Sequence, residues 1–147
     1  MLVEAIMRRE VVTVERDHTA LRVARLMKEG QTGVAIVVDE RRRPIGVITD
    51  RDLTTRILAE GRDHDTPVDV FMTHPVHAIA EDALVFDCLR AMAKHRVHRM
   101  PVIDAEARLV GIVNIADSLL LLTTELANIA EVVGRRRDGG ASDSQLG

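Results

Sequence analysis

The chain contains one segment twice, at a fixed offset. Gly46 to Asp52 return as Gly111 to Asp117, an offset of 65 residues that needs no gap from Met7 onward. The residues identical in this register are Met7/Met72, Val11/Val76, Asp17/Asp82, Arg25/Arg90, Met27/Met92, Val37/Val102, Asp39/Asp104, Arg43/Arg108, Gly46/Gly111 and Asp52/Asp117. An internal repeat sets the architecture, because neighbouring copies complete a shared core. Two copies predict a pseudo-twofold pair with clefts between its halves.

Composition narrows the class of protein. The 147 residues are 46% hydrophobic and 29% charged, which is typical of a soluble globular chain. A net charge of -3 gives no support to a nucleic-acid or membrane-coating role. The single cysteine, Cys88, excludes an internal disulfide and favours a reducing compartment. Charged residues near the N-terminus interrupt any secretory segment, and Leu119 to Leu122 is too short an apolar run to span a bilayer, so we expect a cytoplasmic protein.

Apolar periodicity and turn residues predict the same order of elements in both copies. In the first copy we expect a helical turn at 3–7, strands at 11–14, 33–38 and 45–48, and helices at 19–29 and 49–60. In the second copy we expect a helical turn at 67–72, strands at 76–79, 99–103 and 109–113, and helices at 83–95 and from Asn114 to Val133. Each unit is thus β-α-β-β-α, and two units packed sheet to sheet give an α+β fold with pseudo-twofold symmetry. We place the first domain at 1–62, the second at 63–133, and a disordered, arginine- and glycine-containing tail at 134–147.

Three fragments carry a resemblance to a known family. The run Gly46-Val47-Ile48-Thr49 followed by Asp52 fits a motif of glycine, two apolar residues, Thr or Ser, any two residues, then Asp or Asn. Gly111 to Asp117 is a degenerate copy of it, and His98-Arg99-Met100-Pro101-Val102-Ile103-Asp104 matches a strand signature of the second copy. The chain resembles a tandem pair of cystathionine beta-synthase (CBS) domains, a Bateman module, over about residues 1–130.

The resemblance implies a function as well as a fold. Such modules bind adenine nucleotides (AMP, ADP, ATP) or S-adenosyl compounds between their repeats, pair into homodimers, and regulate a partner protein without catalysing a reaction. The chain has no room for a fused catalytic domain, so it is most similar to stand-alone CBS domain-containing proteins. We therefore expect no enzyme activity, no required cofactor, an adenine nucleotide (AMP or ATP first) as ligand, and an unknown regulated protein in trans. Nucleic acid and membrane are not expected partners.

The residue types suit the sugar and phosphate groups of that ligand. A carboxylate can accept hydrogen bonds from both ribose hydroxyls, and Asp52 and Asp117 are the candidates. Phosphate needs donors and positive potential, which a helix start and Thr49 can supply. The cationic candidates are Arg51, His98 and Arg99. We expect Asp52 and Thr49 to share a ligand with Arg99 across the cleft.

The adenine slot and the second site are less defined by the residues. An apolar slot with backbone hydrogen bonds is expected near Val12 and Thr13, and near Val76 and His77. At the second site Asn114 replaces Thr or Ser beside Asp117, so we expect weaker phosphate binding there. If phosphate binding relies on residues from both copies, the two sites cannot be equivalent, because Gly33-Val34 stands in the first copy where His98-Arg99 stands in the second.

Other interpretations of the same residues remain open. Thr49 and Asp52 also fit a helix capping pair, as do Asn114 and Asp117, and a cap can open when a ligand arrives. A nucleotide-independent dimerisation or protein-interaction scaffold, using the last helix and the arginine tail, is the main rival function. The histidines show no recognised metal spacing, so no metal site is predicted. Cys88 aligns with Val23 and is expected to be a buried packing thiol.

Overall fold

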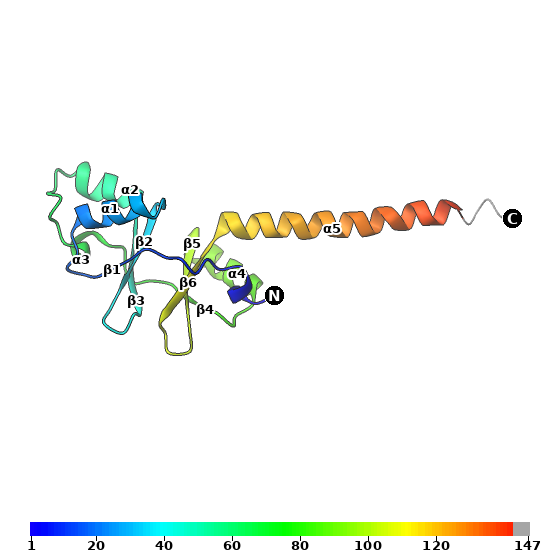
Figure 1. The fold of residues 1–147 in the computed structure, drawn as a ribbon, viewed down its shortest axis with the longest axis horizontal. Coiled ribbons are helices and arrows are strands. Elements are labelled where there is room, and N and C mark those ends of the chain that lie inside the picture. Colours follow the sequence, from blue (N-terminus) through cyan, green and yellow to red (C-terminus); the bar gives the residue numbers. More distant parts are fainter. Residues whose placement is uncertain (143–147) are drawn as a thin grey trace. The chain divides into compact units, whose positions relative to one another are not determined.

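The computed structural model describes residues 1–142, with side chains described to residue 135. Backbone contacts divide the chain into two units, Met1–Asn114 and a second that begins at Ile115. The first unit holds two three-stranded sheets with the same topology, β1-β2-β3 and β4-β5-β6. In each sheet the first strand runs parallel to the second, and the second runs antiparallel to the third. The α+β repeat architecture expected from the sequence is confirmed (Figure 1).

The elements of the two repeats follow one another in the same order. Those of the first repeat are η1 (Val3–Ala5), β1 (Thr13–Val14), α1 (Ala20–Glu29), β2 (Val34–Val38), β3 (Pro44–Thr49), α2 (Asp50–Asp52) and η2 (Leu53–Leu58). Those of the second repeat in the first unit are α3 (Val68–Phe71), β4 (Ile79–Ala80), α4 (Val85–His95), β5 (Arg99–Ile103) and β6 (Leu109–Asn114). Thr19 begins α1 by accepting a hydrogen bond from the Arg22 amide at 3.2 Å.

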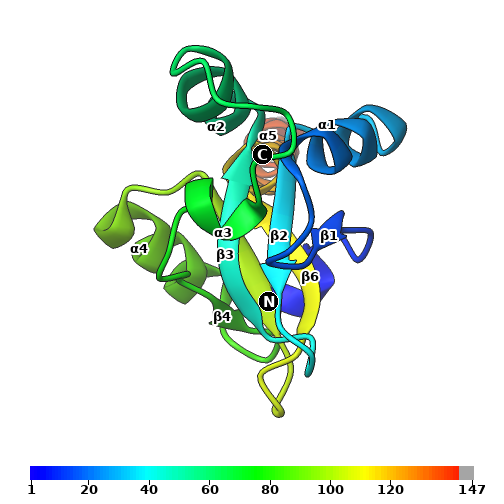
Figure 2. The same cartoon turned by 90° about the vertical axis from the view of Figure 1, so that its left-hand side faces the viewer.

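The two sheets pack face to face through an apolar layer. β2 is buried along its whole length, and its alternate residues Val34, Ile36 and Val38 form a cluster with Leu109 and Ile112 of β6. Figure 2, viewed from the side of the first sheet, shows β2 and β3 in front of β5 and β6. Because side chains alternate across a strand, the remaining residues of β2 face the helices on the other side.

Each sheet also has a separate apolar core on the face that its helices cover. Each of these two cores includes a short helical segment from the other repeat. Val68 and Phe71 of α3 follow the first repeat's elements in sequence and pack with Val23 and Val37 against the first sheet. Val3 of η1 packs with Cys88 and other residues against the second sheet. The short helix that opens each repeat therefore completes the core of the other repeat. Val3 and Val68 lie 65 residues apart, and both are fully buried.

Cys88 is buried in this second core, as predicted, beside Met92 and Met100. Burial disfavours the thiolate and raises the pKa of the Cys88 thiol. The side chain acts as a small apolar group at the position of Val23 in the other repeat.

An aspartate and an arginine four residues apart form the same turn in both repeats, as Asp39 with Arg43 and as Asp104 with Arg108. Asp39 accepts the backbone amides of Arg41 and Arg43 at 2.9 Å each, and the Arg43 Nε donates to its other oxygen at 2.8 Å. Asp104 and Arg108 repeat this arrangement before β6, with an Nε to Oδ2 distance of 2.9 Å. These carboxylates lock the hairpins that carry the third strand of each sheet.

Two predicted elements of the first unit differ in kind or position, and the strand expected over 11–14 is shortened to Thr13–Val14. The helix expected over 49–60 is α-helical only at Asp50–Asp52 and becomes a π-helix at Leu53–Leu58. The hydroxyls of Thr54 and Thr55 donate to the carbonyls of Asp50 and Arg51, where the amides of an α-helix would donate. The strand expected at 76–79 is Ile79–Ala80, because Thr73 instead pairs with Val47 of β3 and the chain then crosses to the second sheet.

The second unit is described by the helix α5 (Ile115–Ser142). It continues past Val133, where the sequence predicted a helix end, so residues 134–142 of the predicted tail are helical and 143–147 lie outside the described residues. Among the described residues, no helix combines the length and apolar character needed to cross a membrane. α5 carries several exposed apolar side chains, among them Leu119, Leu126 and Ile129.

Candidate functional site: two clefts related by the repeat

A cleft of about 570 Å³ lies where the two repeats meet, and we call it the first cleft. Thr49 and Asp52 reach it from the end of β3 and the start of α2. His98 and Arg99 reach it from the start of β5. The structure thus brings acidic and hydroxyl groups of one repeat to the cationic groups of the other. Its remaining lining residues are Val34, Val47, Thr73, His74, Pro75, Val76, His77, His95, Arg96, Val97 and Pro101.

Thr49 and Asp52 form a capping box, as one interpretation of the sequence expected. The Thr49 amide donates to Asp52 Oδ2 at 2.8 Å, and the Asp52 amide donates to Thr49 Oγ1 at 3.2 Å. Asp52 Oδ1 lies 3.5 Å from the Arg56 Nε. The Asp52 side chain is only 16% exposed, and each of its oxygens retains a further acceptor position. The box therefore holds a carboxylate in a fixed place at the rim of the cleft while leaving it able to accept ligand hydroxyls.

The sequence predicted that the backbone amides at the start of α2 could bind phosphate, but in the structure these amides already donate to acceptors within the protein. The Asp50 amide donates to the Gly33 carbonyl, and the Arg51 amide donates to Asp50 Oδ1, both at 2.9 Å. The Asp52 amide is held by Thr49. In this state the positive groups available to an anion in the first cleft are therefore side chains, above all Arg99 and Arg96.

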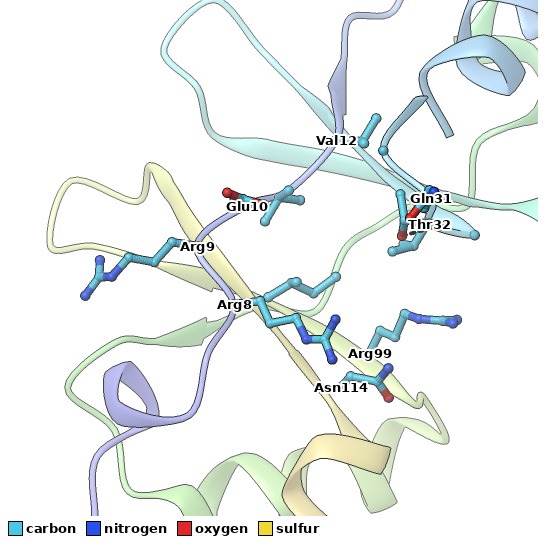
Figure 3. Close-up of a pocket in the computed structure, with 13 residues that line it drawn as sticks. Arg8, Arg9, Glu10, Val12, Gln31, Thr32, Arg99 and Asn114 are labelled. Carbon is cyan, nitrogen blue, oxygen red and sulfur yellow. Dashed lines mark hydrogen bonds between the residues drawn. The ribbon is translucent and has the colours of Figure 1, made fainter. Parts of the chain in front are cut away.

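A second cleft of about 890 Å³ is also lined by residues of both repeats (Figure 3). Its polar groups include Arg8, Arg99 and Asn114, which gather together in Figure 3, whereas Arg9 points away from them. Val12 lines this cleft from the segment before β1. The other lining residues are Glu10, Val11, Gly30, Gln31, Thr32, Gly33, Val34 and Ile112.

The repeat relates the two clefts residue by residue. Every lining residue of the second cleft has a counterpart 65 positions away that lines the first cleft. Thus Asn114 corresponds to Thr49, Arg8 to Thr73, and Val12 to His77. Val34 and Arg99, which are each other's counterparts, line both clefts. The pair therefore has two geometrically related clefts with different chemistry, as the unequal motifs indicated.

Not all of the predicted site residues meet in these clefts. Thr49, Asp52, His98, Arg99, Val76 and His77 line the first cleft, and Val12, Asn114 and Arg99 line the second. Arg51 is exposed and Thr13 is paired to Ile36 in the sheet, and neither lines either cleft. Asp117 lies in the first turn of α5, in the second unit, and its role stays a prediction.

Sequence reasoning missed five basic residues of the clefts. His74, His95 and Arg96 line the first cleft, and Arg8 and Arg9 line the second. The available signal for His95 and Arg96 is their place just before the His98-Arg99 motif, with Val97 between. Their meeting with the segment after Thr73 depends on the chain crossing between sheets, which no local pattern predicts.

Titratable groups in the first cleft influence one another. The rings of His77 and His95 are stacked, with centroids 3.6 Å apart and planes 13° apart. Desolvation lowers the pKa of His95, and the positive charges of His77 and Lys94 lower it further. Where the structure describes side chains, the close groups of three potential metal ligands are Glu15-Asp17-His18 and Asp63-His64-Asp65, both largely exposed and outside the clefts.

Comparison with known proteins places the chain in a family. The sequence model of the CBS domain family matches residues 3–59 and again residues 68–117. The chain belongs to the CBS domain family. CBS domain-containing protein YhcV of Bacillus subtilis is 37% identical over 108 residues, covering 74% of this chain and 76% of that protein. A Methanopyrus kandleri relative is 33% identical over 126 residues, covering 84% of this chain. The chain spans 64% of the length of that relative and 65% of an Acidianus ambivalens relative.

Solved CBS structures share the arrangement. One is the CBS domain pair of protein MJ0100 in complex with 5'-methylthioadenosine and S-adenosyl-L-methionine. Its match covers 85% of this chain and 98% of the MJ0100 chain, with a TM-score of 0.76 and 26% identity. The cytosolic domain of the Mg²⁺ channel MgtE, in complex with ATP, matches 79% of this chain and 46% of its own with a TM-score of 0.69 and 31% identity. CBS pairs of this fold thus bind adenosine-containing ligands.

Proposed function

We propose that this CBS pair is a regulatory module that binds an adenine nucleotide in the first cleft and modulates a partner protein, without catalysing a reaction. One observation carries the proposal. Thr49 and Asp52 of the first repeat line the same cleft as His98 and Arg99 of the second. A ligand held by both pairs bridges the two repeats, and its binding energy can then favour one relative arrangement of them. The cleft volume lies within the usual range for small-molecule sites, roughly 300 to 1,000 Å³.

The proposed contacts follow from the chemistry of each side chain. Asp52 accepts the ribose hydroxyls through the acceptor positions that the capping box leaves open. The Thr49 hydroxyl accepts from the Asp52 amide, so its own proton can be donated to phosphate. Arg99 supplies the bidentate phosphate contact, and Val76 with His77 flanks the base. The ATP complex of MgtE and the adenosine compounds bound by MJ0100 support this ligand class.

Titration calorimetry with AMP and ATP tests the site. We expect Asp52→Asn to weaken binding at least tenfold, because the amide replaces one acceptor oxygen with a donor that opposes a ribose hydroxyl. Asp63→Asn is the matched control, since the Asp63 side chain is 73% exposed and lies outside both clefts. Because the chain has neither Trp nor Tyr, a co-purifying nucleotide would also dominate the ultraviolet spectrum. Absence of heat with any adenine compound would favour the interaction scaffold instead.

We also propose that the chain forms a homodimer through α5. Six of its apolar residues recur at alternating spacings of four and three: Ile115, Leu119, Leu122, Leu126, Ile129 and Val133. This 3.5-residue period is the seam of a coiled coil. The positions beside the seam are Ala116, Ser118, Thr123, Glu125, Ala130 and Val132, of which only Glu125 is charged. Two identical helices can therefore meet along the seam with little repulsion, which favours a second copy of this chain as the occupant.

A further inference from the structure

The first cleft concentrates the histidines of the chain. Four of the six histidines line it: His74, His77, His95 and His98. The repeat does not account for them, because the corresponding residues of the second cleft are Arg9, Val12, Gly30 and Gly33. The histidines therefore belong to the chemistry of one cleft rather than to the fold that both clefts share.

The charged residues around these histidines are basic, with Asp52 as the single exception. Arg96 follows α4, and Arg99 begins β5, so both cleft-lining arginines come from the second repeat. Lys94 precedes His95 on α4 and acts on its charge. Asp52 is the one acidic residue that lines the cleft, and its carboxylate already faces Arg56. The cleft is thus cationic when all four imidazoles are neutral, and each proton they take up adds to that charge.

The stacked pair of rings makes proton uptake depend on what fills the cleft. Desolvation lowers the pKa of His95 below its usual value, and the His77 ring stacked 3.6 Å away lowers it further. A phosphate placed among these rings and arginines reverses the balance, because a nearby negative charge favours the imidazolium form. By linkage, a ligand that raises the pKa of His95 binds more tightly as protons become available.

We propose that the first cleft selects phosphate-bearing adenine nucleotides and takes up protons through its histidines when they bind, and that it disfavours S-adenosylmethionine. This inference rests on the proposed nucleotide function of the same cleft. S-adenosylmethionine carries a positive sulfonium, which meets the arginines and histidines unfavourably, and adenosine carries no charge. The MJ0100 pair, by contrast, is solved in complex with S-adenosyl-L-methionine.

The test is calorimetry of ATP, AMP, adenosine and S-adenosylmethionine on the full chain, with EDTA present to exclude metal bridging. At pH 7.5 each titration is run in two phosphate-free buffers with different ionisation enthalpies. We expect ATP heats that differ between the buffers in the direction of proton uptake, adenosine heats that do not, and at least tenfold weaker binding of S-adenosylmethionine than of ATP. ATP affinity should fall severalfold from pH 6.5 to pH 8.

Paired variants separate the histidines from the rest of the site. In the double variant His77→Gln, His95→Gln we expect the buffer dependence of the ATP heats to shrink and ATP affinity to fall severalfold more at pH 6.5 than at pH 8. His64→Gln is the matched control, because His64 is exposed beside Asp63 and Asp65 and outside both clefts. ATP binding with equal heats in both buffers, or S-adenosylmethionine binding as tight as ATP, would overturn this inference while leaving the nucleotide function standing. No binding of any adenine compound would overturn both.

Discussion

The Sδ atom of Met72 lies 2.5 Å from the position that a Cβ atom on Gly46 would occupy. The repeat reproduces this contact, with the Met7 Sδ 2.7 Å from the same position on Gly111. The glycine of each motif is thus needed where the helical segment of the other half crosses over the third strand. Methionine and glycine are identical in both copies because they form one contact between the copies.

An alanine at Gly46 is expected to destabilise the fold by about 1–3 kcal/mol, because the Met72 Cβ and Cγ also lie within 3.2 Å and must move. Gly111→Ala should behave alike, since the Arg8 carbonyl lies 2.9 Å from the new atom. Gly134→Ala on α5 meets no neighbour within 4 Å and should instead favour the helix by up to about 1 kcal/mol. Urea unfolding followed by circular dichroism measures all three, and unchanged midpoints for the first two would contradict the packing.

The exchanged helical segments predict a crosswise effect of mutation. Val3→Ala removes two buried methyl groups from the second core and should cost about 1–3 kcal/mol. Its matched variant is Val68→Ala, equally buried in the first core. By hydrogen exchange, Val3→Ala should loosen β5 and β6 first, and Val68→Ala should loosen β2 and β3 first. The reverse assignment would mean that each segment supports its own repeat.

Asp39 and Asp104 give the hairpins a pH dependence. Hydrogen bonds from Arg43 lower the pKa of Asp39. At Asp104 desolvation acts to raise the pKa, but the hydrogen bonds from Arg108 outweigh the desolvation, so the pKa of Asp104 is also lowered. A carboxyl whose folded pKa is depressed stabilises the fold above its unfolded value of 3.8, and this contribution is lost as pH falls towards the folded pKa. The double variant Asp39→Asn, Asp104→Asn should therefore unfold at lower urea than wild type at pH 7. The difference should narrow below pH 3.8, and a constant difference down to pH 3 would contradict the pairing.

The seam of α5 predicts a difference between two equally exposed leucines. Leu126, 66% exposed, lies on the seam, whereas Leu120, 69% exposed, lies neither on the seam nor at the positions that flank it. Leu126→Glu places two like charges against each other in a coiled coil and should weaken dimerisation at least tenfold, while Leu120→Glu should change it little. Light scattering after gel filtration across a dilution series gives both values. A dimer that survives Leu126→Glu would have to use another surface.

The site was predictable from sequence to the extent that it is local. Thr49 and Asp52 lie three residues apart at a strand-to-helix junction, so a capping box was expected there and is present. His98 and Arg99 belong to a recognisable strand signature, and both line the expected cleft. By contrast, Val76 and His77 were expected in a strand but lie before β4, and Arg51 was expected at the ligand but is exposed outside the cleft. The π-helical turn after Asp52 depends on hydroxyl competition for carbonyls, which periodicity does not predict.

The sequence by itself determined the repeat, the order of elements and the apolar faces, because a 65-residue offset and strand and helix periods are properties of neighbouring residues. Only the tertiary structure decided which segment completes which core and which histidines share a cleft. Val3 with Cys88, and His77 with His95, are far apart along the chain and meet because η1 and the segment after Thr73 cross between the sheets. Such contacts form when two whole surfaces pack. The free energy of that packing is distributed over many residues, so no local sequence pattern predicts it.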